Sequence, residues 1–147
     1  MEENLCQENI IKKGEYRMEN IKEPLSYVQY SIYVNELVYM IKDSDVIQDL
    51  KAIYAIPRGG YPIGVHLSHN LELPLVTNLA GHKREELLIV DDIADTGVTL
   101  EKVAGMCRAT ATIYYKERST IKPTFYVVVT DKWIVFPWEI MDEIPNR

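Results

Sequence analysis

The chain has 147 residues, of which 47% are hydrophobic and 26% charged, and its formal net charge is −6. This length suits one domain with a well-formed core, and the composition is not that of a disordered chain. Lys and Arg are scattered along the chain, so the basic face typical of nucleic-acid-binding proteins is missing. No segment reaches the roughly 20 apolar residues of a membrane span, and residues 1–20 lack the apolar core of a signal peptide. We therefore expect a cytoplasmic protein that binds neither nucleic acid nor a membrane.

The N-terminal segment differs from the rest of the chain. Residues 1–22 are polar with weak periodicity and predict an extension or a small cap, followed by a single domain over residues 23–147. Cys6 and Cys107 lie far apart in the sequence, without CxxC spacing or clustered histidines. This pattern speaks against a disulfide or a zinc site.

Helical and strand patterns alternate after this segment. Apolar residues at helical spacing predict helices over about residues 30–43, 61–71 and 98–108. Short β-type runs predict strands over residues 51–57, 74–79, 86–93, 111–117 and 125–130. Such an alternation is typical of an α/β protein with a mostly parallel twisted sheet and helices on both faces. In these sheets, ligands bind beyond the carboxyl ends of the strands.

One such strand end carries an unusual cluster of polar residues. Residues 87–100 read LLIVDDIADTGVTL, so a buried strand runs into Asp91 and Asp92, called the acidic pair below. The turn that follows, Thr96-Gly97-Val98-Thr99, offers free backbone N–H groups and two hydroxyls, which suit a phosphate monoester. An acidic turn that only caps a helix would explain one aspartate but not three. A phosphorylated sugar fits better, with its phosphate on the turn and its diol on the acidic pair.

This segment resembles the ribose-phosphate signature of type I phosphoribosyltransferases, an acidic pair followed by Asp-Thr-Gly-x-Thr. The resemblance implies that the acidic pair holds the ribose hydroxyls of 5-phosphoribosyl 1-pyrophosphate (PRPP), directly or through Mg²⁺. It implies that Asp95 faces the base and accepts or removes the proton of its N7, which makes Asp95 the catalytic candidate. It also implies a 5-phosphate site formed by Asp95, Thr96, Gly97, Val98 and Thr99.

Three further segments match the family's pattern. Arg58, Gly59 and Gly60 follow the first predicted strand and fit the family's pyrophosphate loop. This loop often contains a non-proline cis peptide in the family, and the bond to inspect in this chain is Pro57–Arg58. Lys116 ends the strand after the signature, where purine-specific members have a Lys that donates to O6 of the base. Residues 131–139 are similar to the base-binding segment of bacterial xanthine-guanine phosphoribosyltransferases. By that similarity Trp133 stacks on the purine and the backbone of Ile134 reads its edge.

One departure from the family concerns its flexible hood, which usually lies between the third strand and the signature strand. Here only residues 80–86 are available for it. Either His82, Lys83 and Arg84 contact the pyrophosphate directly, or another subunit covers the site. Because family members form dimers and tetramers, we expect a homo-oligomer.

The resemblance spans about residues 25–140 and implies a Mg²⁺-dependent purine salvage enzyme. It would transfer the phosphoribosyl group from PRPP to N9 of a 6-oxopurine (hypoxanthine, guanine or xanthine). The alternatives are a regulator of the same fold that senses PRPP or a nucleotide, and a phosphoribosyltransferase for another base. The sequence leaves open which purine is preferred and the oligomeric state.

Overall fold

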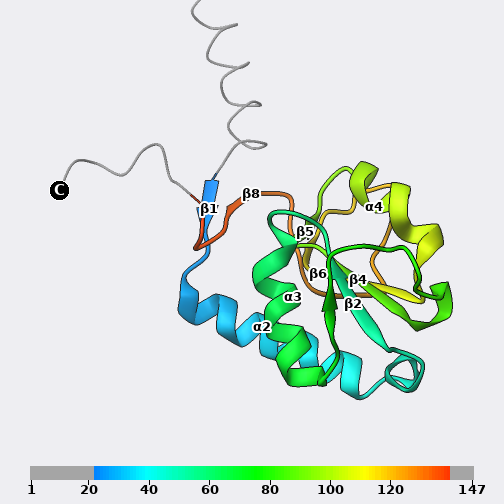
Figure 1. Cartoon of the computed structure of the whole chain (residues 1–147). Coiled ribbons are helices and arrows are strands. Elements are labelled where there is room, and N and C mark those ends of the chain that lie inside the picture. The colour runs from blue at the N-terminus through cyan, green and yellow to red at the C-terminus, as the bar shows by residue number, and fades with distance from the viewer. Residues whose placement is uncertain (1–21, 140–147) are drawn as a thin grey trace, which may run out of the picture. The chain divides into compact units, whose positions relative to one another are not determined.

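The computed structural model describes residues 22–139. The predicted N-terminal extension, except Lys22, and Cys6 lie outside this part of the chain. Two compact units can be distinguished: a larger one formed by Ser31–Thr130, and a smaller one to which residues 22–30 and 131–139 belong (Figure 1). Between residues 22 and 139, no helix has both the length and the apolar character needed to cross a membrane.

The larger unit is built on a parallel sheet. Its strands β3, β2, β4 and β6 lie side by side in this order, and β6 also pairs with β5 and β7. Each of these pairings is parallel, which confirms the predicted fold class. The strands are β2 (Ala52–Ala55), β3 (Leu75–Val76), β4 (Leu87–Val90), β5 (Ile93–Ala94), β6 (Ala109–Tyr115) and β7 (Phe125–Val129).

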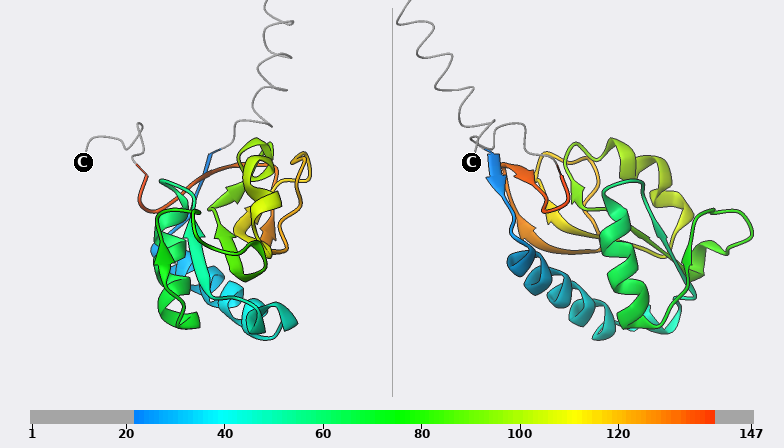
Figure 2. Two further views of the ribbon diagram at one scale, coloured as in Figure 1. Left: turned by 45° about the vertical axis from the view of Figure 1, so that its right-hand side comes forward. Right: turned by 60° about the vertical axis from the view of Figure 1, so that its left-hand side comes forward.

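Helices cover both faces of this sheet (Figures 1 and 2). On one face, Leu100 of α4 (Val98–Val103) packs with Ala52 and Leu87. On the other face, α3 (Gly60–Leu71) approaches so closely that a Cβ on Gly64 would lie 2.6 Å from the Cβ of Ala55. The helix α2 (Tyr27–Lys42) buries the stripe predicted from its spacing, namely Val34, Leu37, Val38 and Ile41. Short 3₁₀ turns complete the larger unit at Asp45–Gln48, Arg84–Glu86 and Ala104–Met106.

The predicted strand over residues 86–93 is interrupted by the acidic pair. Strand β4 ends at Val90 and β5 begins at Ile93. The register against β6 is the same on both sides, with Val90 opposite Ala111 and Ile93 opposite Tyr114. The interruption therefore turns two carboxylates out of an otherwise continuous strand without shifting the strand.

The predicted helix over residues 98–108 is also shorter than expected. The α-helical part ends at Val103, and the chain continues as a 3₁₀ turn that contains Gly105. Glycine weakens a helix because it loses more backbone entropy than other residues when it is fixed.

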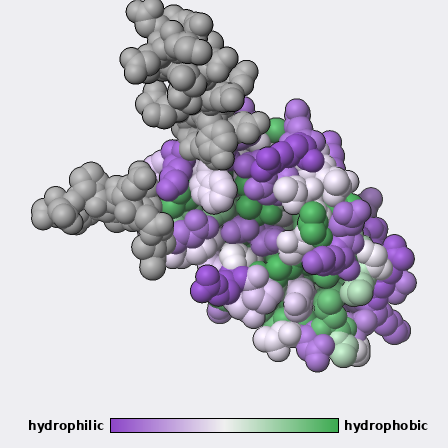
Figure 3. All heavy atoms as spheres, turned by 90° about the horizontal axis from the view of Figure 1, so that it is seen from above, coloured by the Kyte–Doolittle hydropathy of each residue, from purple (hydrophilic) through white to green (hydrophobic). Residues whose placement is uncertain are grey.

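In the smaller unit, β1 (Lys22–Pro24) pairs in parallel with β8 (Trp133–Val135), and neither strand was predicted. Lys132 Nζ lies 3.3 Å from Glu23 Oε1 beside this ladder. Trp138 packs edge to face on Tyr30 and stacks on Phe136, with ring centroids 5.2 and 5.1 Å apart. These ring contacts give Trp138 a structural role within the smaller unit. On the face of the molecule shown in Figure 3, hydrophilic and hydrophobic residues are interspersed.

Candidate functional site

The acidic pair is held by backbone contacts at the end of β4. The N–H of Asp91 donates to Ala111 O on β6 at 3.0 Å, so Asp91 is still anchored to the sheet. Asp91 Oδ1 accepts the N–H of Asp92 at 2.9 Å, and Asp92 Oδ1 accepts the N–H of Ile93 at 2.8 Å. Each carboxylate thus has its Oδ1 engaged with the backbone, which fixes the orientation of both groups at the strand end.

Burial makes the charge on these two carboxylates costly. Burial and the neighbouring Asp92 raise the pKa of Asp91 from 3.8 to about 8. Burial also raises the pKa of Asp92. Two adjacent carboxylates that resist ionisation are stabilised by a ligand that supplies hydroxyl donors or a cation. A sugar diol or a divalent cation meets this requirement.

The loop of Pro57, Arg58, Gly59 and Gly60, called the glycine loop below, packs directly against the acidic pair. A Cβ on Gly59 would collide with the Asp92 carboxylate, and one on Gly60 would lie 2.6 Å from Val90 O. The N–H of Ile56 donates to Val90 O at 2.9 Å and aligns the two segments. The peptide bond between Pro57 and Arg58 is cis, as expected, and Arg58 is exposed. At position 60 a side chain would press on backbone atoms at the end of β4, whereas at position 59 it would displace the Asp92 carboxylate.

Residues 95–99, called the signature turn below, lead into α4. Gly97 has φ +88°, a conformation that favours glycine, and its carbonyl accepts the N–H of Glu101 at 2.8 Å. A Cβ on Gly97 would also lie 2.6 Å from the hydroxyl oxygens of Ser119 and Thr120. The N–H of Thr120 donates to Thr96 O at 2.9 Å. The signature turn is therefore braced by the segment that follows β6.

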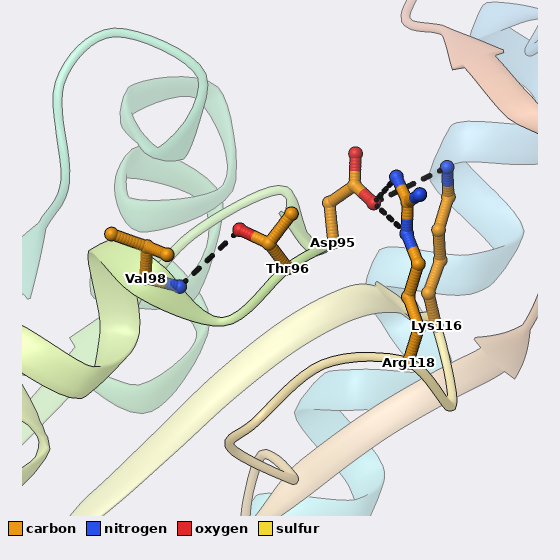
Figure 4. Close-up of polar contacts among 5 residues, drawn as sticks. All are labelled: Asp95, Thr96, Val98, Lys116 and Arg118. Carbon is orange, nitrogen blue, oxygen red and sulfur yellow. Dashed lines mark hydrogen bonds and ion pairs between the residues drawn. The ribbon is translucent and has the colours of Figure 1, made fainter.

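Asp95 contacts two cations from that segment, both through the same carboxylate oxygen (Figure 4). Arg118 Nε donates to Asp95 Oδ1 at 2.9 Å, and Arg118 Nη2 donates to the same oxygen. Lys116 Nζ forms an ion pair with this oxygen at 3.4 Å. The Lys116 side chain is only 6% exposed, whereas those of Asp95 and Arg118 are 37% and 60% exposed. The structure thus brings Asp95 and Lys116 together.

Arg118 was not among the sequence-based candidates. An arginine beyond the end of a strand usually marks a solvated surface. The sequence held no clear signal for it, because Lys116 and Arg118 are brought to the same carboxylate by a turn, which the N–H of Ser119 closes on Lys116 O at 2.9 Å.

The remaining candidates belong to other segments of the chain. Trp133 and Ile134 are on β8 of the smaller unit, where Trp133 is 51% exposed and Ile134 is buried. Their contact with a base stays a prediction. His82, Lys83 and Arg84 are exposed in the connection between β3 and β4, and Arg84 begins a 3₁₀ turn. This connection spans only residues 77–86, which confirms that the hood is short.

Residues 22–139 contain no group of three or more His, Cys, Asp or Glu side chains that is arranged to hold a metal ion. A cation at the acidic pair would therefore need further oxygens from a ligand or from water. This is how Mg²⁺ is commonly bound beside phosphates.

Comparison with known proteins places the chain in a family, although no family model matches it. It is 33% identical over 112 residues to a xanthine-guanine phosphoribosyltransferase of Nitratidesulfovibrio vulgaris, covering 60% of this chain and 69% of the relative. It is 28% identical over 139 residues to the xanthine-guanine phosphoribosyltransferase of Desulfotalea psychrophila, covering 79% of this chain and 85% of the relative.

Solved structures agree with this result. A purine phosphoribosyltransferase from Pyrococcus horikoshii superposes with a TM-score of 0.71 at 28% identity, covering 86% of this chain and 99% of that one. A Helicobacter pylori xanthine-guanine-hypoxanthine phosphoribosyltransferase also superposes with a TM-score of 0.71, covering 82% of this chain and 93% of that one. Because the two sequences are only 22% identical, this likeness supports the fold alone. The chain therefore belongs to the type I phosphoribosyltransferase family.

Proposed function

We propose that this protein transfers the 5-phosphoribosyl group of PRPP to N9 of a 6-oxopurine and releases pyrophosphate and a nucleoside 5′-monophosphate. The observation that carries this proposal is the pairing of Asp95 with the buried Lys116, 3.4 Å apart. A carboxylate acceptor beside an ammonium donor matches the N7–H and O6 of a 6-oxopurine, which lie on one edge of the base. Relatives named xanthine-guanine phosphoribosyltransferase support the same substrate class.

The sugar phosphate would occupy the acidic pair, the glycine loop and the signature turn. Asp91 and Asp92, whose carboxylates the backbone orients at the end of β4, would accept hydrogen bonds from the ribose hydroxyls. Free N–H groups of the signature turn would bind the 5-phosphate. Arg58 and the amides of Gly59 and Gly60 would receive the pyrophosphate. The packing of the glycine loop on the acidic pair supports this arrangement, because it joins two of these subsites.

The acidic pair also fits Mg²⁺. Its two carboxylates offer the hard oxygen ligands that Mg²⁺ prefers, and a ligand's diol and phosphates would complete the coordination. When bound, Mg²⁺ would neutralise charge on the departing pyrophosphate.

The base would be activated and positioned by this chain's own side chains. Asp95 would hold the N7 proton of the purine and so leave the lone pair of N9 free to attack C1 of the ribose. Lys116 would donate to O6, and its burial strengthens this contact because little water competes for it. Trp133 would stack on the base, and backbone groups of Ile134 would read its edge. Orienting the base in this way turns an encounter into a near-attack arrangement.

An Asp95→Asn variant tests this proposal. We expect wild-type protein, given PRPP, Mg²⁺ and guanine, to form the nucleoside monophosphate, detected by mass spectrometry. The variant should lose about 10²- to 10⁴-fold in turnover, the usual contribution of a positioned acid or base. Its PRPP affinity, measured by calorimetry, should stay within about threefold because Asp95 faces the base. An Asp95→Asn protein with wild-type turnover would remove Asp95 from the mechanism.

A further inference from the structure

The Asp95 carboxylate is contacted unequally by its two cations. Arg118 makes two hydrogen bonds to Oδ1, one of them at 2.9 Å from Nε. Lys116 approaches the same oxygen only to 3.4 Å, which is longer than the roughly 2.7–2.9 Å of a charge-assisted hydrogen bond. Arg118 is therefore the residue that holds Asp95, and the Lys116 ammonium keeps its hydrogens for another acceptor.

The second oxygen of Asp95 has a different environment. No hydrogen bond reaches Oδ2 from any residue between 22 and 139. Figure 4 shows one oxygen facing both cations and the other turned away from them. Because a carboxylate is planar, fixing Oδ1 also fixes the direction of Oδ2.

The backbone that carries Arg118 is itself fixed. The N–H of Ser119 donates to Lys116 O at 2.9 Å, and Ser119 Oγ donates to Ile121 O at 2.7 Å. The N–H of Thr120 donates to Thr96 O, beside Asp95, at 2.9 Å. Arg118 thus projects from a braced turn rather than from a free loop. Its hold on Asp95 costs less side-chain and backbone entropy than a typical surface ion pair.

We propose that Arg118 is a positioning residue for base recognition: it fixes Oδ1 of Asp95 so that Oδ2 accepts the N7–H of the purine. This inference rests on the proposed function. A stabilising role alone does not account for the arrangement, because an ion pair with an arginine 60% exposed contributes little to stability. Arg118 thus orients the Asp95 carboxylate that accepts N7–H, and Lys116 donates to O6.

Arg118→Gln tests this inference, with Arg108→Gln as the matched control. Arg108 also forms an exposed ion pair with an aspartate, Asp49, at 3.2 Å. Its backbone N–H, however, donates to Leu87 O at the start of β4, which is the end of the strand away from the acidic pair. For Arg118→Gln we expect the KM for guanine to rise by about tenfold, the value of one charge-assisted hydrogen bond. The KM for PRPP and the melting temperature should match those of the control. Arg118→Lys should restore part of the loss.

A base analogue separates positioning from general damage to the site. In 7-deazaguanine a C–H group replaces N7, so this base has no N–H at that position to donate a hydrogen bond to Oδ2. As a competitive inhibitor it should bind wild type and Arg118→Gln within about twofold, while guanine distinguishes them by about tenfold. Equal losses for both bases, kinetics identical to those of Arg108→Gln, or faster turnover by Arg118→Gln would each overturn the inference. Absence of transferase activity in the wild type would instead overturn the proposed function.

Discussion

Replacing Gly60 by Ala tests whether the glycine loop must pack against the acidic pair. The added Cβ would lie 2.6 Å from Val90 O and 3.3 Å from Asp91 Cα, and both are backbone atoms that cannot rotate away. Reaching an ordinary contact of 3.4 Å requires the two segments to separate by roughly 0.8 Å. Gly105 provides the matched control, because a Cβ there meets nothing within 4 Å and neither glycine has a positive φ.

The expected magnitudes follow from this geometry. Overpacking of this kind costs about 1–3 kcal/mol, whereas replacing Gly by Ala at an unstrained position gains about 0.4–1 kcal/mol. We therefore expect Gly60→Ala to lower the free energy of unfolding by about 1–2 kcal/mol and Gly105→Ala to raise it slightly. For a domain of this size, each kcal/mol corresponds to roughly 3–4 °C in Tm. A displacement near 1 Å in the site should also reduce kcat/KM for PRPP by about 10- to 100-fold.

Thermal unfolding by circular dichroism and steady-state kinetics with PRPP as the varied substrate measure the two effects. Both variants are compared with wild type under the same conditions. If Gly60→Ala matches Gly105→Ala in Tm and in kcat/KM, the contact between the loop and the acidic pair does not constrain the site.

Three further changes give sharp expectations. Because the folded pKa of Asp91 is raised from 3.8 to about 8, the folded state binds the extra proton, so this group's contribution to stability falls as pH rises through that interval. At pH 8, Asp91→Asn should therefore have a free energy of unfolding in urea about 1 kcal/mol or more above that of wild type, yet it should fail to bind PRPP. A stability equal to or below that of wild type would contradict this expectation. Trp133→Ala should raise the KM for the purine by about 5- to 150-fold, as for other base stacks, and an unchanged KM would mean that Trp133 does not stack. Lys116→Met, which keeps the buried stem, should raise the KM for guanine at least about tenfold, and a smaller change would assign O6 to another donor.

The alternation of helices and strands could be predicted from the sequence because it depends on the local spacing of apolar residues. All four residues of β4 are buried, and the apolar stripe of α2 points inward as its spacing indicates. The pairing of β1 with β8 could not be predicted, because each strand has three residues and the two segments are far apart in the chain. The break between β4 and β5 was missed because the apolar run continues past the acidic pair in the sequence.

The candidate site could be proposed from the sequence for a related reason. The acidic pair and the signature turn are contiguous, so their chemistry is visible as a motif. The contacts of Gly59 with Asp92 and of Arg118 with Asp95 join residues from separate segments. Such contacts depend on the register of the sheet and on the turn after β6, which residue types alone do not determine. An arginine that orients a carboxylate has the same sequence appearance as one that faces solvent.

Transfer to a 6-oxopurine is tested most directly by measuring pyrophosphate release from PRPP and Mg²⁺ with hypoxanthine, guanine, xanthine, adenine and uracil offered separately. We expect release with one or more of the 6-oxopurines and none with uracil, because only a 6-oxopurine presents N7–H and O6 to Asp95 and Lys116. Release with uracil or adenine alone would contradict the assigned base contacts. Absence of release with any base, in a protein that still binds PRPP, would contradict the transferase itself and favour a regulator of the same fold.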